Sequence, residues 1–498
     1  MIDINYILSH MGNHKMIRMT SAAYAHETAQ SGFTAKYLEE LVTRVRNGKL
    51  KIAIYGLGHV GAPLTAAWLR AGAYVIGIDK SEKVREFARE GKTPISEPQV
   101  NEAFAKGRRE NRFSVYDDPV AASKDSFFKM ICVPVMAENS NANLQAVENV
   151  MSSIGIGLKY GDVVALTPSV PPGTTEDFVL PILREKSGLE CERDFFLVYN
   201  PERIFEGRAV QDIEDGYPAI VAGAGPQSSI MASALYQLIF KKGVIKLSSP
   251  KTAEFEKLIE GVYRDVNIAL ANELAMISER IGVNFWEARD AANSQSFCHL
   301  HRPGIGVGGA CIPVYPQFVI DIARKNDIES PITTYGRLVN EKMPSYAVNE
   351  ALSACQRVQS KTKSLKDYRV TLLGLAFRGG VSDTRLSPTY RVIEELFKKG
   401  IKNIQVHDPL VVHDPALSKY PGVDLKNDLK LSLKWADLVI IVADHAEYSD
   451  LDLQEVGKAV VYDGRGMIDT SKPFGPNIVS MGVGKNKTST MKIQKPSI

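Results

Sequence analysis

The sequence predicts an α/β chain in which two doubly wound domains are joined by a long central helix. Two blocks of short β-rich runs alternate with helical stretches, which is the pattern of a mostly parallel sheet with helices on both faces. Between the blocks, residues 250–281 carry apolar side chains at helical spacing. At 498 residues the chain is also too long for one core, since domains commonly hold about 100–200 residues.

The first predicted element is a helix that precedes the sheet. Thr34 is its expected N-cap, and Asn47-Gly48 ends it. Its apolar stripe consists of Leu38, Leu41, Val42 and Val45. We expect this helix to serve as a packing arm or as a subunit contact.

The strands are predicted from apolar, β-branched runs bounded by turn residues. In the first block these runs are Lys51–Tyr55, Tyr74–Ile78, Phe127–Val133, Val163–Leu166, Phe195–Tyr199 and Ala219–Val221. In the second block they are Val370–Leu373, Asn403–Val406, Leu438–Val442 and Ala459–Tyr462, with a helix at about Pro388–Lys399. The residues from about Met481 onward are rich in Lys, Ser, Thr and Gly and predict a disordered tail.

Composition argues against several classes of protein. Lys and Arg number 60 against 57 Asp and Glu, so a net charge of +3 predicts no nucleic-acid partner. No apolar run reaches the ~18 residues of a membrane span, and the N-terminus lacks a secretion signal. The five cysteines form no CxxC pair and no spaced Cys/His set. We therefore expect no metal site, no disulfide framework and a reducing, cytoplasmic location.

A glycine-rich turn follows the first predicted strand. The run Ile52-Ala53-Ile54-Tyr55-Gly56-Leu57-Gly58-His59-Val60-Gly61 places GxGxxG between a strand and a helix. Gly56 permits the tight turn, Gly58 lets the backbone approach a pyrophosphate, and Gly61 lets helix and strand pack closely. Asp79, at the end of the next strand, can accept hydrogen bonds from ribose hydroxyls. The first block is therefore predicted to be a Rossmann-like domain that binds NAD.

Two alternatives stay open at this turn. Lys80, beside Asp79, leaves room for tolerance of NADP. A glycine-rich turn can also lack a ligand altogether. The strand before the motif, the helix after it and the acidic residue at the next strand favour NAD.

A second glycine-dense loop contains a cysteine. The segment is Pro303-Gly304-Ile305-Gly306-Val307-Gly308-Gly309-Ala310-Cys311-Ile312-Pro313. Such a loop can bring several N–H groups close to a ligand and can stabilise a thiolate at Cys311. Taken alone, a cysteine among glycines is more often a small buried residue than a nucleophile.

Together with these two loops, further motifs resemble the UDP-glucose/GDP-mannose dehydrogenase family over about Lys51–Ile468. They are Pro94-Ile95-Ser96-Glu97-Pro98, Pro171-Pro172-Gly173-Thr174-Thr175-Glu176, Asn200-Pro201-Glu202-Arg203, the helical segment from Lys257 to Glu273, and Gly374-Leu375-Ala376-Phe377-Arg378 with Asp383-Thr384-Arg385 and Ser387-Pro388. The form of the cysteine loop is more similar to the branch acting on UDP-N-acetylhexosamines, especially UDP-N-acetylmannosamine, than to the UDP-glucose branch.

We expect five segments, of which the resemblance implies the middle three, and the resemblance also implies an oligomer. The segments are an N-terminal extension (1–49), an NAD-binding Rossmann-like domain (50–248), a central helical domain for dimerisation that carries the catalytic loop (249–360), a C-terminal nucleotide-sugar-binding Rossmann-like domain (361–480) and a disordered tail (481–498). A homodimer or a dimer of dimers is implied, with the long helix as its pairing element. The alternative is a helix that serves only as a spine within one chain.

The reaction implied by the resemblance is a four-electron oxidation of the C6 alcohol of a UDP-sugar to the carboxylate, with two successive hydride transfers to NAD. Cys311 would capture the intermediate aldehyde as a thiohemiacetal, and its oxidation would give a thioester that water hydrolyses. The product would be a uronic acid precursor for a cell-surface polysaccharide or glycoprotein glycan.

The resemblance also implies roles for individual residues. Cys311 is the nucleophile, Lys257 stabilises the alkoxide and the oxyanion, and Glu202 is a base or positions water. NAD contacts are implied for Gly56, Gly58, His59, Val60, Gly61, Asp79, Val133, Pro134 and Arg385. Substrate contacts are implied for Glu206, Arg264, Asn267, His301, Gly308, Gly309 and Arg378, and both Arg378 and Arg385 correspond to residues around the diphosphate.

Each assignment has a plainer alternative. A lysine on an amphipathic helix, such as Lys257, is usually a solvated residue. Glu202 can be a capping or salt-bridge carboxylate. Arg385 can pair with the neighbouring Asp383 rather than with a phosphate.

Four positions depart from the pattern of the family. Val135 replaces a Thr, Gly261 an Asn, Phe297 an Arg that contacts the sugar, and Tyr315 an Asp. In the family the Asn and the Asp help to position water and the oxyanion, so their loss puts the hydrolytic half of the reaction in question. A tyrosine hydroxyl can donate a hydrogen bond but, with a pKa of about 10, is a poor base at neutral pH.

Several interpretations follow from these departures. The chain can be an enzyme with a rewired site for an unusual nucleotide sugar, an enzyme that works slowly or stops at the aldehyde, or a paralogue that binds without turnover. A UDP-glucose 6-dehydrogenase and a two-electron hydroxyacid dehydrogenase are further alternatives, although the latter needs no cysteine in this loop. Retention of Cys311, Lys257, Glu202 and the glycine motif favours the first interpretation.

Overall fold

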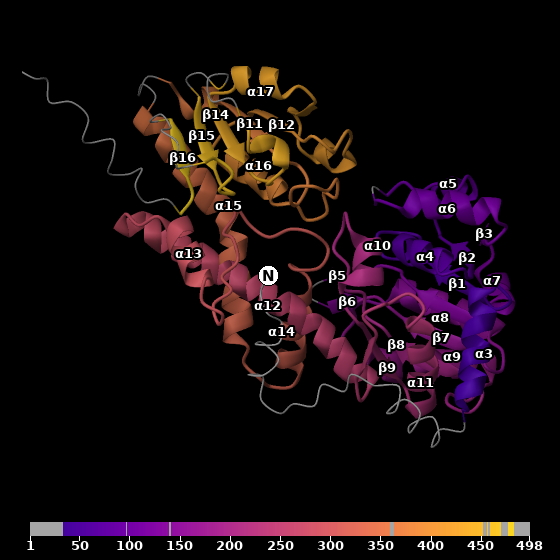
Figure 1. Ribbon diagram of the computed structural model, residues 1–498. Helices are drawn as coiled ribbons and strands as arrows, with labels where there is room; N and C mark the ends of the chain where they lie inside the picture. Colours follow the sequence, from indigo (N-terminus) through magenta and orange to yellow (C-terminus); the bar gives the residue numbers. More distant parts are fainter. Residues whose placement is uncertain are drawn as a thin grey trace, which may run out of the picture. The chain divides into compact units, whose positions relative to one another are not determined.

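The computed structural model describes residues 33–95, 97–138, 141–358, 363–451, 456, 459–469 and 477–482. The chain divides into two compact units, a first unit of Met1–Val135 with Ala142–Lys257 and a second unit of Met136–Asn141 with Leu258–Ile498. Figure 1 colours the first unit from indigo to magenta and the second, apart from Met136–Asn141, from pink to yellow. Most of the expected N-terminal extension (up to residue 32) and nearly all of the expected tail (from residue 483) lie outside the described residues.

The first unit is built on an eight-stranded sheet of order β10-β9-β8-β7-β4-β1-β2-β3. Its strands are β1 (Lys51–Tyr55), β2 (Tyr74–Ile78), β3 (Phe113–Val115), β4 (Phe128–Ile131), β7 (Val163–Leu166), β8 (Phe196–Tyr199), β9 (Ala219–Gly223) and β10 (Val244–Lys246). Neighbouring strands run parallel except for β8 and β9. The strand order reverses between β1 and β4, which is where a doubly wound sheet opens a crevice for a ligand.

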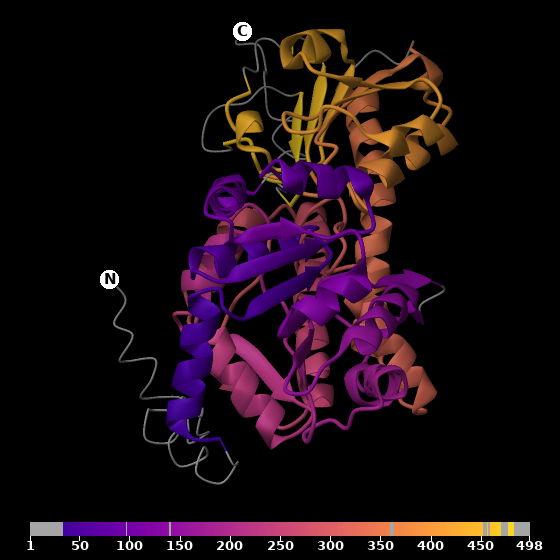
Figure 2. The same ribbon diagram turned by 90° about the vertical axis from the view of Figure 1, so that its right-hand side faces the viewer.

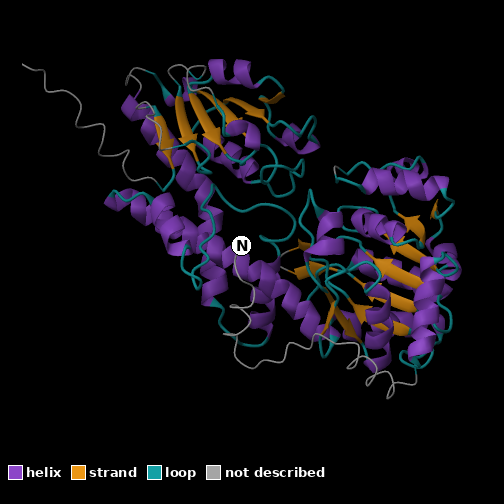
Figure 3. Ribbon diagram, viewed as in Figure 1, coloured by secondary structure: helices purple, strands orange, loops and turns teal. Residues whose placement is uncertain are grey.

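Helices cover both faces of this sheet (Figure 3). They are α3 (Ala35–Arg46), α4 (Gly61–Arg70), α5 (Glu82–Arg89), α6 (Val100–Arg109), α7 (Pro119–Asp125), α8 (Gln145–Gly157), the π-helix η1 (Thr174–Val179), α9 (Leu180–Ser187), α10 (Ala209–Gln211), the π-helix η2 (Asp212–Gly216) and α11 (Pro226–Tyr236). Because side chains of a strand alternate between faces, Ile52 and Ile54 of β1 enter one core while Ala53 and Tyr55 enter the other.

The N-terminal helix α3 forms as expected. The Thr34 hydroxyl caps it by accepting the N–H of Tyr37 at 3.1 Å. Leu38, Leu41 and Val45 are buried in a core of the first unit, and α3 lies beside α11. The helix therefore serves as a packing arm of this unit (Figure 2).

The second unit contains a six-stranded parallel sheet of order β13-β12-β11-β14-β15-β16. Its strands are β11 (Arg369–Leu373), β12 (Asn403–His407), β13 (Val423–Lys426), β14 (Leu438–Ile441), β15 (Val460–Asp463) and β16 (Ile478–Ser480); a separate two-stranded sheet pairs β5 (Met136–Glu138) with β6 (Asn141–Asn143). The six-stranded order reverses between β11 and β14, as in the first sheet. The predicted fold, with two Rossmann-like doubly wound domains and a long helix between them, is confirmed.

The helices of the second unit include two long ones. They are α12 (Pro250–Ile281), which begins in the first unit, α13 (Phe285–Asn293), α14 (Tyr315–Lys325), α15 (Pro331–Val358), the 3-10 helix η3 (Leu365–Asp367), α16 (Pro388–Lys398), the 3-10 helix η4 (Pro415–Lys419), α17 (Leu429–Trp435) and the 3-10 helix η5 (Ala446–Tyr448). The observed bounds of α12 match the predicted helix. In the part of the chain that the structure describes, no helix has both the length and the apolar composition to cross a lipid bilayer.

A buried polar network joins α12 to α15. Asp265 accepts hydrogen bonds from Arg337 at 2.7 Å and from the Asn340 amide at 2.8 Å. The side-chain oxygen of Asn340 in turn accepts a hydrogen bond from the Asn272 amide. The side-chain oxygen of Asn272 accepts the N–H of Gly304 at 2.8 Å. The network therefore anchors the start of the cysteine loop to the two long helices.

Candidate functional site

The glycine turn after β1 has the geometry that its sequence predicts. Gly56 has φ +97°, and a Cβ there would lie 2.9 Å from the Cys132 carbonyl oxygen. A Cβ on Gly61 would lie 1.8 Å from the carbonyl oxygen of Gly56, so only glycine lets α4 pack on the turn. A Cβ on Gly58 would meet no atom within 4 Å. Open space beside Gly58 fits the approach of a dinucleotide pyrophosphate to the backbone.

Helix α4 presents its positive end at this turn. Val60 occupies its N-cap position, and no side chain caps the helix. The first helical hydrogen bond runs from Ala62 N–H to the carbonyl of Gly58 at 3.0 Å. Amides of the preceding residues, including His59, thus lie at the terminus where a phosphate is most stabilised.

Asp79 holds the glycine turn against β2. One carboxylate oxygen accepts the N–H of Leu57 and the other accepts that of Ser81, both at 2.8 Å. A carboxylate has about four acceptor positions, so capacity for ribose hydroxyls remains. Val133 and Pro134 follow Cys132, the first residue after β4, and the Cys132 N–H donates to the Tyr55 carbonyl of β1. These predicted NAD contacts therefore gather at the point where the strand order reverses.

Lys257 and Glu202 form a shielded ion pair within the first unit. Lys257 Nζ lies 3.6 Å from Glu202 Oε1, and the two side chains are 9% and 11% exposed. The other oxygen of Glu202 accepts the N–H of Ile204 at 3.0 Å. Lys257 is therefore not the solvated lysine of the plainer alternative. A cation and a carboxylate side by side can stabilise an oxyanion and hold a water molecule.

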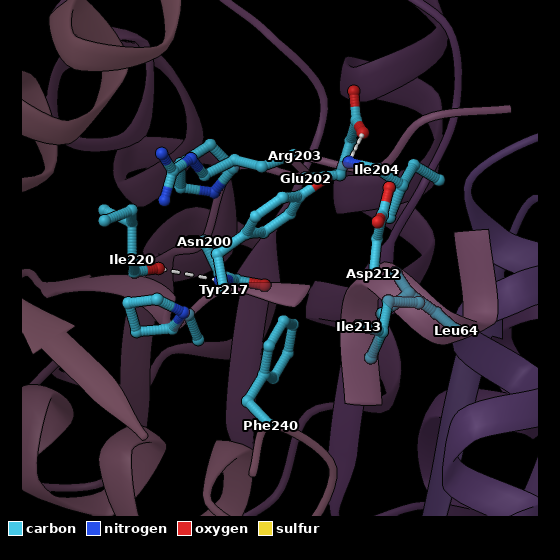
Figure 4. A pocket seen from close by; sticks show the side chains of 13 residues that line it. Leu64, Asn200, Glu202, Arg203, Ile204, Asp212, Ile213, Tyr217, Ile220 and Phe240 are labelled. Atoms are coloured by element: carbon cyan, nitrogen blue, oxygen red, sulfur yellow. Dashed lines mark hydrogen bonds between the residues drawn. The ribbon is translucent and has the colours of Figure 1, made fainter. Parts of the chain in front are cut away.

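A small pocket adjoins the segment that carries Glu202 (Figure 4). Its lining consists of Leu64, Asn200, Pro201, Glu202, Arg203, Ile204, Asp212, Ile213, Tyr217, Pro218, Ala219, Ile220 and Phe240. The Asn200 amide donates to the Ile220 carbonyl at 2.7 Å, and the Arg203 guanidinium lies 5.3 Å from the centre of the Tyr217 ring. These contacts fix the backbone on either side of Glu202.

Glu254, which the sequence did not single out, is a buried carboxylate next to Lys257. It lies one turn before Lys257 on α12 and is fully buried. Its carboxylate accepts the N–H groups of Gly173 at 2.5 Å and Thr175 at 2.7 Å, and the Thr175 hydroxyl at 2.6 Å. Burial raises the pKa of Glu254. The i, i+3 spacing to Lys257 was the available signal, and the contact fixes the Pro-Pro-Gly-Thr-Thr motif beside the lysine's helix.

Glu97 organises the loop that carries Glu206. It accepts the N–H groups of Gly207 at 2.6 Å and Ala209 at 3.2 Å, and burial raises its pKa. Glu206 lies 3.4 Å from Nδ1 of His59. The structure thus brings a residue predicted to contact substrate next to one predicted to contact NAD.

Cys311 differs from the buried cysteines of the chain. It is exposed, whereas burial raises the pKa of Cys132 and of Cys355 to about 12. Its carbonyl accepts the N–H groups of Val314 and Tyr315, each at 3.0 Å, so Cys311 opens the turn that leads into α14. Exposure and position both argue against the small buried cysteine of the plainer alternative.

The glycines of the cysteine loop are required by packing within the second unit. A Cβ on Gly308 would lie 2.7 Å from the Leu386 carbonyl oxygen, and one on Gly309 would lie 3.1 Å from the Phe377 ring. Gly309 also has φ +87° and donates its N–H to the Arg385 carbonyl at 2.9 Å. Both glycines are buried. The loop at these positions therefore packs against the Phe377–Pro388 segment and does not expose its backbone N–H groups to a ligand.

Three predicted substrate residues come together between α12, which carries Arg264 and Asn267, and the loop after α13, which carries His301. Asn267 accepts the N–H of His301 at 2.8 Å and donates to the His299 carbonyl at 2.8 Å. Burial lowers the pKa of His301, and the charges of Arg264 and Arg289 lower it further. His301 is therefore neutral at physiological pH and can act as either donor or acceptor.

The two arginines of the C-terminal motif have different partners. Arg378 donates to the Gly379 carbonyl at 2.8 Å and lies over the Phe377 ring. Arg385 pairs with Asp383, with its Nη2 2.6 Å from Oδ2. Pairing with Asp383 was the plainer alternative for Arg385, and the structure shows that pair.

The second sheet repeats the turn geometry of the first. Gly374 has φ +103° after β11, and Asp408 after β12 accepts the N–H groups of Leu375 at 2.7 Å and Ala376 at 2.9 Å. Burial raises the pKa of Asp408, but hydrogen bonds from His445 and Ala376 outweigh it and bring the pKa to about 2. The sequence reasoning did not single out Asp408, although its place after the second strand of the block matches that of Asp79.

The four departures from the family pattern lie in different surroundings. Val135 is partly buried against the core of the first unit that contains Ala53 and Tyr55. Phe297 is 90% exposed. Gly261 and Tyr315 contact each other, since a Cβ on Gly261 would lie 2.5 Å from Cδ2 of the tyrosine ring.

Comparison with known families matches three consecutive parts of the chain. Residues 50–240 match the NAD binding domain of the UDP-glucose/GDP-mannose dehydrogenase family. Residues 251–342 match its central domain, and residues 371–470 match its UDP binding domain.

Individual relatives extend over most of the chain. The UDP-N-acetyl-D-mannosamine dehydrogenase of Pyrococcus horikoshii is 30% identical over 442 residues, which cover 88% of this chain and 99% of that protein. The NDP-N-acetyl-D-galactosaminuronic acid dehydrogenase of Ralstonia nicotianae is 30% identical and covers 84% and 96%. Among solved structures, the UDP-D-ManNAc dehydrogenase of Pyrococcus horikoshii superposes with a TM-score of 0.79 at 29% identity, covering 88% of this chain and 100% of that one. A UDP-glucose dehydrogenase of Pyrobaculum islandicum gives 0.77 at 26% identity, covering 87% and 98%.

Proposed function

Because the chain belongs to the UDP-glucose/GDP-mannose dehydrogenase family, we propose that it oxidises the C6 alcohol of a UDP-N-acetylhexosamine to the carboxylate. UDP-N-acetylmannosamine is the first substrate to test, with UDP-N-acetylglucosamine second. The relatives with that activity in their names, at 30% identity over most of the chain, support this choice. The chain is an NAD-dependent UDP-sugar dehydrogenase, and NAD supplies the acceptor for two hydrides when bound.

The first unit would hold the dinucleotide. The open space at Gly58 and the uncapped start of α4 suit a pyrophosphate, while Asp79 keeps the turn in place and retains acceptor capacity for a ribose. Val133 and Pro134 line the other side of the strand-order reversal.

Cys311 would carry the oxidised carbon. Its thiolate adds to the aldehyde carbon, which forms a C–S bond and breaks the C=O π bond; the carbonyl oxygen takes up a proton and becomes the hydroxyl of a thiohemiacetal. Loss of a hydride and a proton from this thiohemiacetal gives the thioester. Addition of water then breaks the C–S bond and yields the carboxylic acid and the thiol.

Lys257 and Glu202 would act at the steps in which negative charge develops on oxygen or a proton is transferred. The lysine ammonium stabilises the alkoxide of the alcohol and the oxyanion of the tetrahedral adduct. Glu202, 3.6 Å away, can accept a proton or orient the attacking water. Their shielding from solvent strengthens both effects.

The observation that carries the proposal is the exposed thiol of Cys311, in the turn that leads into α14, whereas the buried thiols of Cys132 and Cys355 have raised pKa values. The test is an NADH-coupled screen of UDP- and GDP-sugars with the full chain. We expect about two NADH per sugar consumed, and loss of uronate formation in Cys311→Ala. Cys298→Ala, in the same loop region, is the matched control and should retain activity. Absence of NADH with every sugar would overturn the proposal.

A second candidate function is binding of NAD or a nucleotide sugar without turnover, and the departures at Gly261, Phe297 and Tyr315 favour it. Calorimetry with UDP-N-acetylmannosamine separates the two. Binding without NADH production, unchanged in Cys311→Ala, supports this candidate. One hydride per turnover with a free carbonyl product would instead indicate a two-electron dehydrogenase.

A further inference from the structure

Gly261 and Tyr315 form a matched contact within the second unit. An added Cβ on Gly261 would lie 2.5 Å from Cδ2 of Tyr315, 3.1 Å from its Cβ and 3.2 Å from its Cγ. Glycine is unfavourable inside a long helix such as α12. The tyrosine ring explains its presence, because any side chain at position 261 would collide with the ring.

Tyr315 is also one turn away from the proposed nucleophile. Its N–H donates to the Cys311 carbonyl at 3.0 Å, and side chains at i and i+4 of such a turn lie on the same face. Tyr315 is 7% exposed, while Cys311 is exposed. The ring therefore connects the turn that carries the thiol to the surface of α12 at Gly261.

The chemistry of this pair differs from that of a polar pair. A phenol with a pKa of about 10 is neutral at pH 7 and can donate a hydrogen bond, but it is a poor base. Glycine contributes no polar side chain. The Tyr315 ring carbons also fill the space beside Gly261 that a polar side chain at that position would occupy. Tyr315 cannot deprotonate a water molecule as a carboxylate does, and Gly261 has no side-chain group with which to orient one.

We propose that Gly261 and Tyr315 act as one unit that slows hydrolysis of the Cys311 thioester, so that the acyl-enzyme accumulates during turnover. This inference rests on the proposed function. The step it concerns is redox-neutral: the water oxygen bonds to the acyl carbon, the C–S bond breaks, sulfur takes up a proton, and the acid formed ionises. Tyr315 is a positioning residue here, and its ring is seated by the glycine.

The first test measures NADH formation on rapid mixing of the full chain with NAD and UDP-N-acetylmannosamine. We expect a burst of about two NADH per active site, followed by a steady phase at least ten-fold slower. Mass spectrometry of the quenched protein should find the acyl group on the peptide that contains Cys311. Hydroxylamine, a stronger nucleophile than water, should speed the steady phase at least ten-fold and release a hydroxamate.

The second test changes the pair. Gly261→Asn together with Tyr315→Asp should raise the steady rate at least ten-fold and abolish the burst, because the smaller side chain at 315 makes room for the larger one at 261. Gly261→Asn alone is expected to displace the ring and fold poorly, so Tyr315→Asp alone is the second readout and should raise the steady rate in part. Gly336→Ala on α15, where an added Cβ meets Val266 at 3.3 Å, is the control and should leave the ratio of burst to steady rate unchanged.

The outcomes separate the inference from the proposed function. Linear NADH formation without a burst, with no response to hydroxylamine, overturns the inference and leaves the dehydrogenase intact. A steady rate in the double variant equal to that of the parent, with a retained burst, also overturns it. No NADH from any nucleotide sugar removes the proposed function itself.

Discussion

Individual glycines in this protein serve distinct physical purposes that a motif does not distinguish. Gly61 is needed for packing, since a Cβ there would lie 1.8 Å from a backbone oxygen, whereas Gly58 borders open space. Gly308 and Gly309 resemble ligand-binding glycines in sequence, but in the structure they pack against Phe377 and Leu386. The same residue type thus supports folding at one position and ligand access at another.

This difference predicts opposite effects of two alanine substitutions in one motif. Gly58→Ala should change the free energy of unfolding by less than about 0.5 kcal/mol but weaken NAD binding about ten-fold or more, because the methyl group enters the space of the pyrophosphate. Gly61→Ala should destabilise the first unit by about 2 kcal/mol or more through overpacking. Chemical denaturation and NAD titration measure the two quantities. Equal destabilisation by both substitutions would contradict this assignment.

The shielded pair of Lys257 and Glu202 leads to a second prediction at residue scale. Lys257→Met should lower the rate of NADH formation about 100-fold or more with little change in NAD affinity, because it removes the charge that stabilises the oxyanion. Lys251→Met is the matched control, since Lys251 lies on the same helix but is exposed. A similar loss in both variants would mean that Lys257 acts through general charge or folding.

At the scale of elements, each domain uses an aspartate after its second strand to tie down a turn after its first. Asp79 accepts from Leu57, and Asp408 accepts from Leu375 and Ala376. The positive φ of Gly56 and Gly374 completes the correspondence. The two domains therefore use the same arrangement, a glycine of positive φ and an aspartate that accepts backbone N–H groups, to fix the turn after the first strand.

Asp408 makes the free energy of unfolding of the second unit dependent on pH in the acidic range. Its pKa falls from an ordinary 3.8 to about 2 on folding, so its contribution is fully present above about pH 4 and is lost as pH falls toward 2. A shift of this size corresponds to about 2 kcal/mol. Asp408→Asn should lower stability by about that amount at pH 7 and flatten its pH dependence between 4 and 2. Denaturation of the parent and the variant across this range tests the claim, and parallel curves would refute it.

At the scale of the whole molecule, the long helix α12 carries large apolar side chains that remain exposed in a single chain. Tyr263 is 55% exposed, Leu270 46% and Ile277 48%, and they recur at intervals of seven residues. Such a spacing places them along one stripe of a helix. The stripe suits association with a second copy of the chain.

We therefore expect the protein to be a dimer or a dimer of dimers in solution. Sedimentation equilibrium of the full chain should give a mass at least twice that of the 54.8 kDa monomer. Leu270→Glu should shift the equilibrium toward monomer because a charge enters the apolar stripe, while Leu431→Glu, at an exposed position of α17, should not. A monomeric parent would leave α12 as a spine within one chain.

Prediction of the fold from sequence succeeded where local patterns and burial agree. The inner strands β1, β2 and β7 match their predicted bounds, because each is a mostly apolar, buried run bounded by turn residues. The edge strands β3, β10, β13 and β16 were missed. β10 is only partly buried and β13 alternates buried with exposed residues, so neither forms a continuous apolar run.

Local sequence was sufficient for the two sheets, the long helix, the capped α3 and the glycine turn, because each depends on side-chain spacing or on a backbone conformation that few residues adopt. Tertiary structure alone revealed which distant residues meet. Glu254 reaches Thr175 across 79 positions, Asp265 reaches Arg337 across 72, and Gly261 faces Tyr315. These pairings depend on the packing of whole helices and loops, and no spacing rule within one segment encodes them. The departures at positions 261 and 315, which look like two separate losses in the sequence, are one steric contact in space.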